Sequence, residues 1–121
     1  MFMRLELVAL KIPSGWTVDF NTFCRVELED IREDSDLIWE LNEDILQMSN
    51  FHFNVILDLG WYPAHNIDGK YILKLVKQSV DMDTQTNNWR TPLLLFKSRN
   101  IDEVIEQINS LLIKVAEGQI S

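Results

Sequence analysis

Nine carboxylate side chains lie between residues 27 and 44 of this 121-residue chain. They are Glu27, Glu29, Asp30, Glu33, Asp34, Asp36, Glu40, Glu43 and Asp44. Arg32 is the only base among them, so the segment carries eight net negative charges, which equals the formal net charge of −8 for the whole chain. Carboxylates at this density suit three kinds of chemistry: acid–base catalysis by a pair, ligation of a cation, and attraction of a basic surface.

Catalysis has little support in the sequence. A carboxylate pair needs one member whose pKa is raised by an apolar pocket, whereas a dense run of acids is more typical of a solvated face. Neither histidine, His52 or His65, is tied by a motif to a serine or to Cys24. The four glycines are scattered singly, which does not indicate a phosphate-binding loop. We therefore expect no catalytic residue, with a small carboxylate-pair hydrolase as the enzymatic alternative.

Metal and cofactor binding are not indicated either. The two histidines are not at the spacing of helical zinc ligands, and Cys24 has no second cysteine beside it. The acids do not form the twelve-residue loop with alternating oxygen donors and a central glycine that binds calcium. A single cysteine cannot form an internal disulfide, and the strand-like surroundings of Cys24 favour a buried, inert thiol. We expect no metal and no cofactor.

Charge and hydropathy also disfavour two classes of partner. Nucleic-acid binding needs clustered Lys or Arg, whereas the basic residues here are spread along the chain. No segment has the roughly 18 to 20 apolar residues of a membrane helix. The N-terminus does not have the pattern of a signal peptide. We expect a cytoplasmic protein that binds neither nucleic acid nor membrane.

The third kind of chemistry, attraction of a basic surface, fits the apolar residues inside the run. Trp39 lies among the acids with Ile38 and Leu41 beside it, and an aromatic anchor with a charged rim is typical of a protein interface. Solubility alone is the alternative role for the acids, and a place in the core is the alternative for Trp39. The residues expected to contact the partner here are Glu33, Asp34, Asp36, Trp39, Glu40, Glu43 and Asp44.

A second aromatic feature follows a predicted strand. Trp61, Tyr62 and His65 lie at the end of that strand and in the loop beyond it. Such a corner either binds a partner or simply packs a hairpin. We expect Trp61 to pack and Tyr62 or His65 to make contact, so both of these join the candidate partner-binding residues.

The elements that position these side chains can be predicted from periodicity. Alternating residues predict strands over residues 4–12, 51–62 and 71–76, with the last two forming an antiparallel hairpin. An abundance of β-branched and aromatic residues predicts a further strand over residues 16–27, broken near 19–21. A short apolar run predicts a strand covered on both faces over residues 92–97. Residues 81–88 are polar and predict an exposed loop.

Two helices are expected. Ser35 is a candidate N-cap for a helix over residues 36–48, for which two short irregular pieces are the alternative. Asn100 is a candidate N-cap for an amphipathic C-terminal helix that Gly118 can end. The length fits one domain, residues 1–121. The predicted fold is α+β: a mainly antiparallel sheet of about five strands with the C-terminal helix packed on one face.

Three segments have a recognisable pattern when they are taken together: residues 43–47 (Glu-Asp-Ile-Leu-Gln), 58–63 (Asp-Leu-Gly-Trp-Tyr-Pro) and 68–73 (Asp-Gly-Lys-Tyr-Ile-Leu). With these segments the chain resembles the small immunity proteins of bacterial polymorphic toxin and contact-dependent growth inhibition systems. The resemblance covers residues 37 to 105 and rests on a pattern, because immunity proteins have no catalytic signature. It implies an inhibitor that binds the C-terminal toxin domain of a contact-delivered effector, often a nuclease, and protects the cell that makes it.

The charge of the chain suits this implication independently. A nuclease needs a basic groove for its substrate, and an acidic inhibitor is attracted to such a groove. We therefore expect a monomer that neutralises a cognate basic toxin by stoichiometric binding. A structural or adaptor subunit of a homo-oligomer, joined through a sheet edge or the helix, is the alternative.

Overall fold

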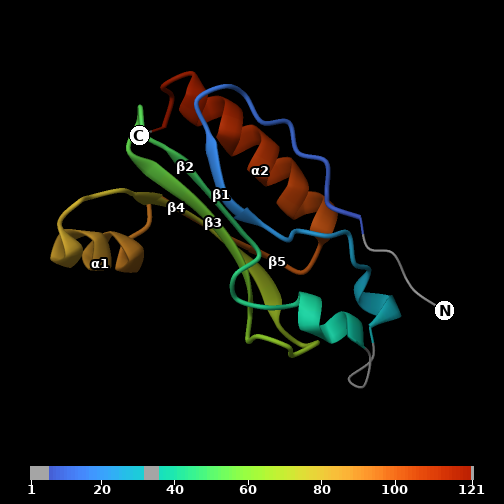
Figure 1. The fold of residues 1–121 in the computed structure, drawn as a ribbon. Coiled ribbons are helices and arrows are strands. Elements are labelled where there is room, and N and C mark those ends of the chain that lie inside the picture. The colour runs from blue at the N-terminus through green and yellow to red at the C-terminus, as the bar shows by residue number, and fades with distance from the viewer. Residues whose placement is uncertain (1–5, 32–35, 121) are drawn as a thin grey trace.

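The structure, a computed structural model, describes residues 6–31 and 36–120. Its five strands form one antiparallel sheet in which spatial order follows chain order (Figure 1). The strands are β1 (Thr17–Asn21), β2 (Leu46–Asn50), β3 (Val55–Tyr62), β4 (Lys70–Lys77) and β5 (Leu94–Ser98). The helices are α1 (Met82–Arg90) and α2 (Ile101–Ala116), and the 3-10 helices are η1 (Leu28–Asp30) and η2 (Asp36–Glu40). The α+β prediction is therefore confirmed.

The core lies between one face of the sheet and α2, which runs along that face in Figure 1. Strand alternation turns Leu57 and Leu59 of β3 and Leu73 of β4 inward, where all three are fully buried. Ile108 of α2 is equally buried opposite them. Burial of each such side chain stabilises the fold by roughly 1.5–3 kcal/mol. The apolar stripe predicted for the C-terminal helix is thus the surface that closes the core.

The ends of α2 also follow the prediction. The Asn100 side chain accepts hydrogen bonds from the backbone N–H groups of Asp102 and Glu103, at 2.9 and 3.2 Å. These bonds satisfy two of the donors that the first turn of a helix leaves unpaired. Gly118 follows the helix with a φ of 73°, a conformation that glycine adopts without steric cost.

The second face of the sheet is only partly covered. Helix α1 lies on this side (Figure 1) and contacts β4, where the Gln85 and Asn88 side chains donate to the carbonyl oxygen of Lys77 at 2.9 and 3.1 Å. Farther along the same face, Asp58 of β3 stands opposite Lys74 of β4 and is only partly buried. The open part of the face leads toward the end of the molecule that carries η2 (Figure 1).

The helix predicted over residues 36–48 is wrong. Residues 36–40 form the short helix η2, and residues 46–50 form β2, which pairs with both β1 and β3. Leu46 and Met48 alternate with Gln47 and are fully buried, so tertiary pairing overrides a spacing that only imitates a helix. The alternative of two short irregular pieces is closer to the structure, because the segment divides into η2 and β2. The proposed N-cap Ser35 lies outside the described residues.

Two other predictions on the second half of the chain are wrong. Residues 81–88 belong to a helix, because Asp81 caps α1 by accepting from the backbone N–H of Thr84 at 2.8 Å. Strand β5 is not covered on both faces, since it is an edge strand and the side chain of Leu95 is 50% exposed. The three consecutive leucines predicted a strand covered on both faces. The prediction failed because apolar character alone does not distinguish a central strand from an edge strand.

The predictions for the first half were correct in part. The described part of residues 4–12 forms only an isolated bridge between Leu7 and Cys24, not a strand. Within residues 16–27 only β1 is a strand, with a register shift between Val18 and Phe20. The strand predicted over residues 51–62 begins later, at Val55, after a turn. The hairpin of β3 and β4 is antiparallel as predicted.

Candidate partner-binding surface

Trp39 projects from η2 into solvent. Its neighbours Ile38 and Leu41 are 6% and 1% exposed and anchor the segment in the core, whereas the Trp39 side chain is 62% exposed. A 3-10 helix has three residues per turn, so Ile38 and Leu41 lie on one side of it and Trp39 on another. The indole is therefore a surface residue, and the alternative of a core tryptophan is wrong.

The ring of His65 lies edge-on to the ring of Trp39, with centroids 4.7 Å apart and planes at 62°. Two backbone hydrogen bonds bring the corner after β3 to this place. His65 donates its N–H to the carbonyl oxygen of Leu41 at 2.6 Å, and Trp61 donates to that of Asn42 at 2.8 Å. The acidic segment and the aromatic corner, which the sequence presents as separate features, thus form one surface.

Tyr62 joins this surface through a close backbone approach at Gly60. A Cβ atom at Gly60 would lie 2.2 Å from the carbonyl oxygen of Glu43 and 2.8 Å from Cε2 of Tyr62. The Tyr62 ring therefore lies against Gly60, beside the backbone of the acidic segment. Burial, followed by the charges of Asp58, Glu43 and Asp44, raises the pKa of Tyr62.

Asp58 is a charged residue of this region that the sequence analysis did not select. Burial raises its pKa to about 6, against the opposing effects of a hydrogen bond with Gln47 and the charge of Lys74. The charge of Asp44 raises it further. Alternation along β3 places Asp58 on the same face as Tyr62, and this parity was the available signal.

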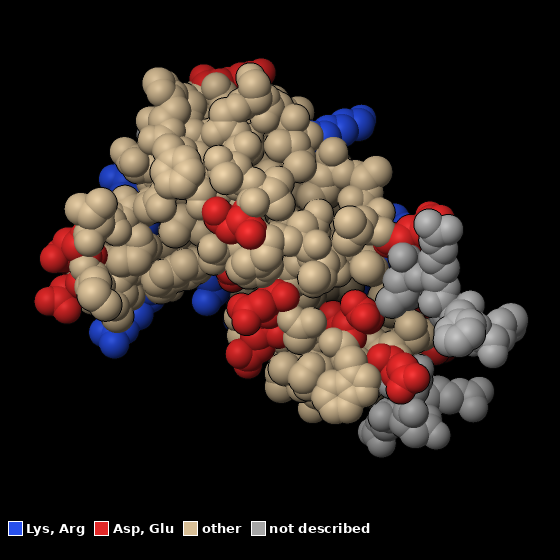
Figure 2. Space-filling view, viewed as in Figure 1, with Lys and Arg blue, Asp and Glu red and all other residues tan. Residues whose placement is uncertain are grey.

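Most of the described carboxylates at this end of the molecule form no salt bridge with another described residue. Figure 2 shows acidic side chains gathered around the end that carries η1 and η2. Within the part of the chain that the structure describes, Arg25 forms both salt bridges, to Glu27 at 3.3 Å and to Asp102 at 2.8 Å. Among the described residues, no salt bridge therefore neutralises the acids of η2 or of the loop after it. Of the predicted contact residues, Glu33 and Asp34 lie outside the described residues.

We call the remaining set the Trp39 surface. It consists of Asp36, Trp39, Glu40, Glu43, Asp44, Tyr62 and His65. Tyr62 and Glu40 are half-buried, and the other five side chains are exposed. The sequence predicted all seven as contact residues but not their common location.

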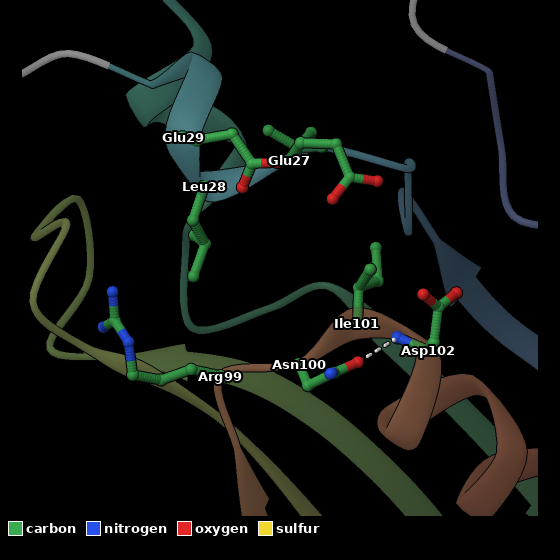
Figure 3. A pocket seen from close by; sticks show the side chains of 8 residues that line it. Glu27, Leu28, Glu29, Arg99, Asn100, Ile101 and Asp102 are labelled. Atoms are coloured by element: carbon green, nitrogen blue, oxygen red, sulfur yellow. Dashed lines mark hydrogen bonds between the residues drawn. The ribbon is translucent and has the colours of Figure 1, made fainter.

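A shallow pocket of about 300 Å³ lies nearby, between η1 and the start of α2 (Figure 3). Most of its polar side chains are already engaged, since Arg25 pairs with both Glu27 and Asp102 and Asn100 caps α2. Arg99 donates to the carbonyl oxygens of Ile67, at 3.0 Å, and Gly69. Its guanidinium also lies 5.8 Å from the ring centroid of Trp61. The pocket is therefore a structural junction rather than a set of convergent free groups.

Other candidate chemistry can be located in the same way. Burial, followed by the charge of Glu40, raises the pKa of the Cys24 thiol, which disfavours the nucleophilic thiolate. Among residues 6–31 and 36–120, no group of three His, Cys, Asp or Glu side chains is arranged to hold a metal ion. None of the helices in these ranges is long and apolar enough to cross a bilayer.

Comparison of the chain with protein-family models, with curated proteins and with solved structures found no match.

Proposed function

We propose that this protein is an immunity protein, which binds a basic toxin domain through the Trp39 surface and neutralises it stoichiometrically. The observation that carries the proposal is the exposed indole of Trp39 among carboxylates that form no salt bridge with any described residue. A solvated acidic face gains nothing from an exposed tryptophan, whose burial would be worth roughly 1.5–3 kcal/mol. A binding surface does gain, because aromatic anchors ringed by polar groups carry most of the energy of an interface.

The electrostatics support a basic partner. The Trp39 surface carries four carboxylates at one end of the molecule. Such a surface attracts a basic protein, because opposite potentials speed the encounter of two proteins. Steering of this kind lifts association rates toward about 10⁸–10⁹ M⁻¹s⁻¹ at low salt. A toxin that attacks nucleic acid has the complementary basic groove. The resemblance to immunity proteins points the same way, and we propose that the protein acts in the cytoplasm of the cell that makes it.

Co-expression tests the proposal most directly. If the gene immediately upstream encodes a long secreted protein, the toxin to test is the C-terminal domain of that protein. Expressed alone it should stop growth, and this protein should restore growth and form a 1:1 complex with it. A complex that forms without restoring growth, or a lack of any complex, contradicts the proposal.

Association kinetics test the surface. Replacing Glu40, Glu43 and Asp44 together by Ser should slow association about five- to tenfold at low salt and flatten its salt dependence. The matched control replaces three exposed acids elsewhere, Asp83, Glu106 and Glu117, by Ser. Because net charge changes equally in both variants, only a local field separates them. Equal slowing by the two variants would reject the Trp39 surface as the contact.

A second candidate function, a subunit of a homo-oligomer, is favoured by one observation at an edge of the sheet. Strand β5 ends the sheet, and the side chains of Leu93 and Leu95 near this edge are 41% and 50% exposed. An exposed, apolar edge strand is a template for pairing with another chain. The other edge strand, β1, is protected by the register shift between Val18 and Phe20. Sedimentation of the pure protein separates the two candidates.

A further inference from the structure

The Trp39 surface contains an aromatic platform that is held in place before any partner binds. Trp39 is 62% exposed, and the ring of His65 supports it edge-on at 4.7 Å. The bond from the His65 N–H to the Leu41 carbonyl fixes the support, and the Asn42 side chain donates to the carbonyl oxygen of Trp39 at 3.3 Å. A platform held by its own hydrogen bonds costs little ordering entropy on binding.

We propose that the Trp39–His65 pair is the stacking site for one arginine side chain of the partner. This inference rests on the proposed function, because it assumes a basic partner at the Trp39 surface, and it names the partner group that the platform selects. The proposal commits to a guanidinium presented by a protein, rather than to a general attraction of positive charge.

The chemistry of the platform favours arginine over lysine. A guanidinium is planar and weakly hydrated, so it stacks on an indole ring and still presents N–H groups at its edge. We expect the acids that follow Trp39 in the chain, Glu40, Glu43 and Asp44, to supply the acceptors for those N–H groups. A lysine ammonium is attracted by the same acids, but it is compact and strongly hydrated and gains less from the ring.

The charge around the platform matches this ligand. Glu40, Glu43 and Asp44 form no salt bridge with any basic side chain in the described parts of the chain. The arginine nearest in the chain among the described residues, Arg25, is engaged by Glu27 and Asp102. The described residues therefore provide no guanidinium to these carboxylates, and a basic partner supplies one.

Two peptides of equal charge test the inference. Nona-arginine and nona-lysine are titrated into the pure protein, and affinity is measured by calorimetry at one low salt concentration. We expect nona-arginine to bind the wild-type protein several-fold more tightly. Trp39→Ala should weaken nona-arginine binding about fivefold and nona-lysine binding less than twofold. His65→Asn, which keeps a residue tolerant of the left-handed backbone at this position (φ 58°), should weaken nona-arginine binding in the same selective way.

Phe51→Ala is the matched control. Phe51 is also an exposed aromatic residue, at 59%, but it lies in the turn between β2 and β3. Its removal should leave both affinities unchanged. Equal loss of both peptides in the Trp39→Ala protein, or no loss of either, overturns the arginine site.

The result also separates this inference from the proposed function. If only the arginine site is absent, both peptides still bind and both still weaken when Glu40, Glu43 and Asp44 are replaced. If the acidic surface itself does not bind basic partners, neither peptide responds to those replacements. The melting temperature of Trp39→Ala is measured first, so that a change in peptide affinity is not caused by unfolding. We expect it to equal that of the wild type, because the Trp39 side chain is exposed.

Discussion

The backbone N–H of His65 donates to the carbonyl oxygen of Leu41 at 2.6 Å, across a sequence separation that includes β2 and β3. Because Leu41 is 1% exposed, this bond ties the corner after β3 to a segment that is itself fixed in the core. The exposed rings of Trp39 and His65 meet as a consequence. Core packing at one residue therefore determines the geometry of a surface two residues away.

Gly60 is predicted to be the least replaceable glycine of this region. In Gly60→Ala the new Cβ would lie 2.2 Å from the carbonyl oxygen of Glu43, and backbone atoms cannot move aside cheaply. We expect a loss of about 2–3 kcal/mol in the free energy of unfolding, measured by chemical denaturation. Gly118→Ala is the control: its Cβ meets only Phe53 at 3.6 Å, and the positive φ alone should cost about 1–2 kcal/mol. Equal losses would show that the contact with Glu43 is relaxed in solution.

Truncation of Trp61 is predicted to lower the free energy of unfolding strongly, whereas truncation of Trp39 is predicted to leave it almost unchanged. Trp61 is fully buried, donates its Nε1–H to the carbonyl oxygen of Asn66 at 2.7 Å, and packs edge-on against Tyr71. Trp61→Ala should therefore destabilise the protein by about 3–5 kcal/mol. Trp39→Ala should change the free energy of unfolding by about 0.5 kcal/mol or less. A large loss at Trp39 would mean that the indole supports the fold and is not held ready for a partner.

The parts of the fold that the sequence predicts well are those with a strict period. The stripe of α2 and the alternation of β3 repeat often enough to identify the buried side, and both are confirmed. The helix prediction over residues 36–48 is wrong because the apolar residues of this segment fit a helical period and a strand period at once. Leu37 and Leu41 have helical spacing, while Leu46 and Met48 alternate, and only pairing with β1 and β3 decides between these periods.

The site shows the same division. The sequence selects the residues of the Trp39 surface by type, because acids and aromatic residues are recognisable without a structure. These residues lie together because of the long-range backbone hydrogen bonds of His65 and Trp61, which no local sequence pattern predicts. Asp58 was missed because a single aspartate on the outer side of a strand is ordinary, and only burial distinguishes it.

Asp58 is predicted to make stability depend on pH. Its pKa rises from 3.8 to about 6 on folding, so the folded protein holds this proton more tightly than the unfolded chain does. Raising the pH from 4 to above 6 therefore costs stability, and the cost persists at higher pH. With allowance for solvent screening at a partly exposed group, we expect about 1–2 kcal/mol.

The variant Asp58→Asn isolates this effect. It cannot ionise, so it should match the wild type at pH 4 and exceed its free energy of unfolding by about 1–2 kcal/mol at pH 7. Urea denaturation of both proteins at the two pH values measures the difference, in which other titrating groups cancel. A constant difference between the proteins across this range would show that the pKa of Asp58 is the same in the folded and unfolded states.

The exposed edge of β5 is the surface through which the homo-oligomer hypothesis predicts self-association. If this protein is a subunit of a homo-oligomer, sedimentation velocity should show a concentration-dependent dimer, and Leu95→Lys should abolish it, because a lysine on an edge strand opposes pairing. Val80→Lys, at a fully exposed residue outside the sheet, is the matched control and should leave the dimer intact.

Salt separates this association from binding to a basic partner. Two chains with a formal charge of −8 repel each other, so added salt screens the repulsion and should strengthen a dimer held by backbone pairing and leucine contacts. Attraction between the Trp39 surface and a basic toxin should weaken under the same conditions. A wild-type protein that sediments as a monomer at every concentration and salt level rejects the subunit hypothesis and leaves the edge of β5 solvated, as expected for a stoichiometric inhibitor.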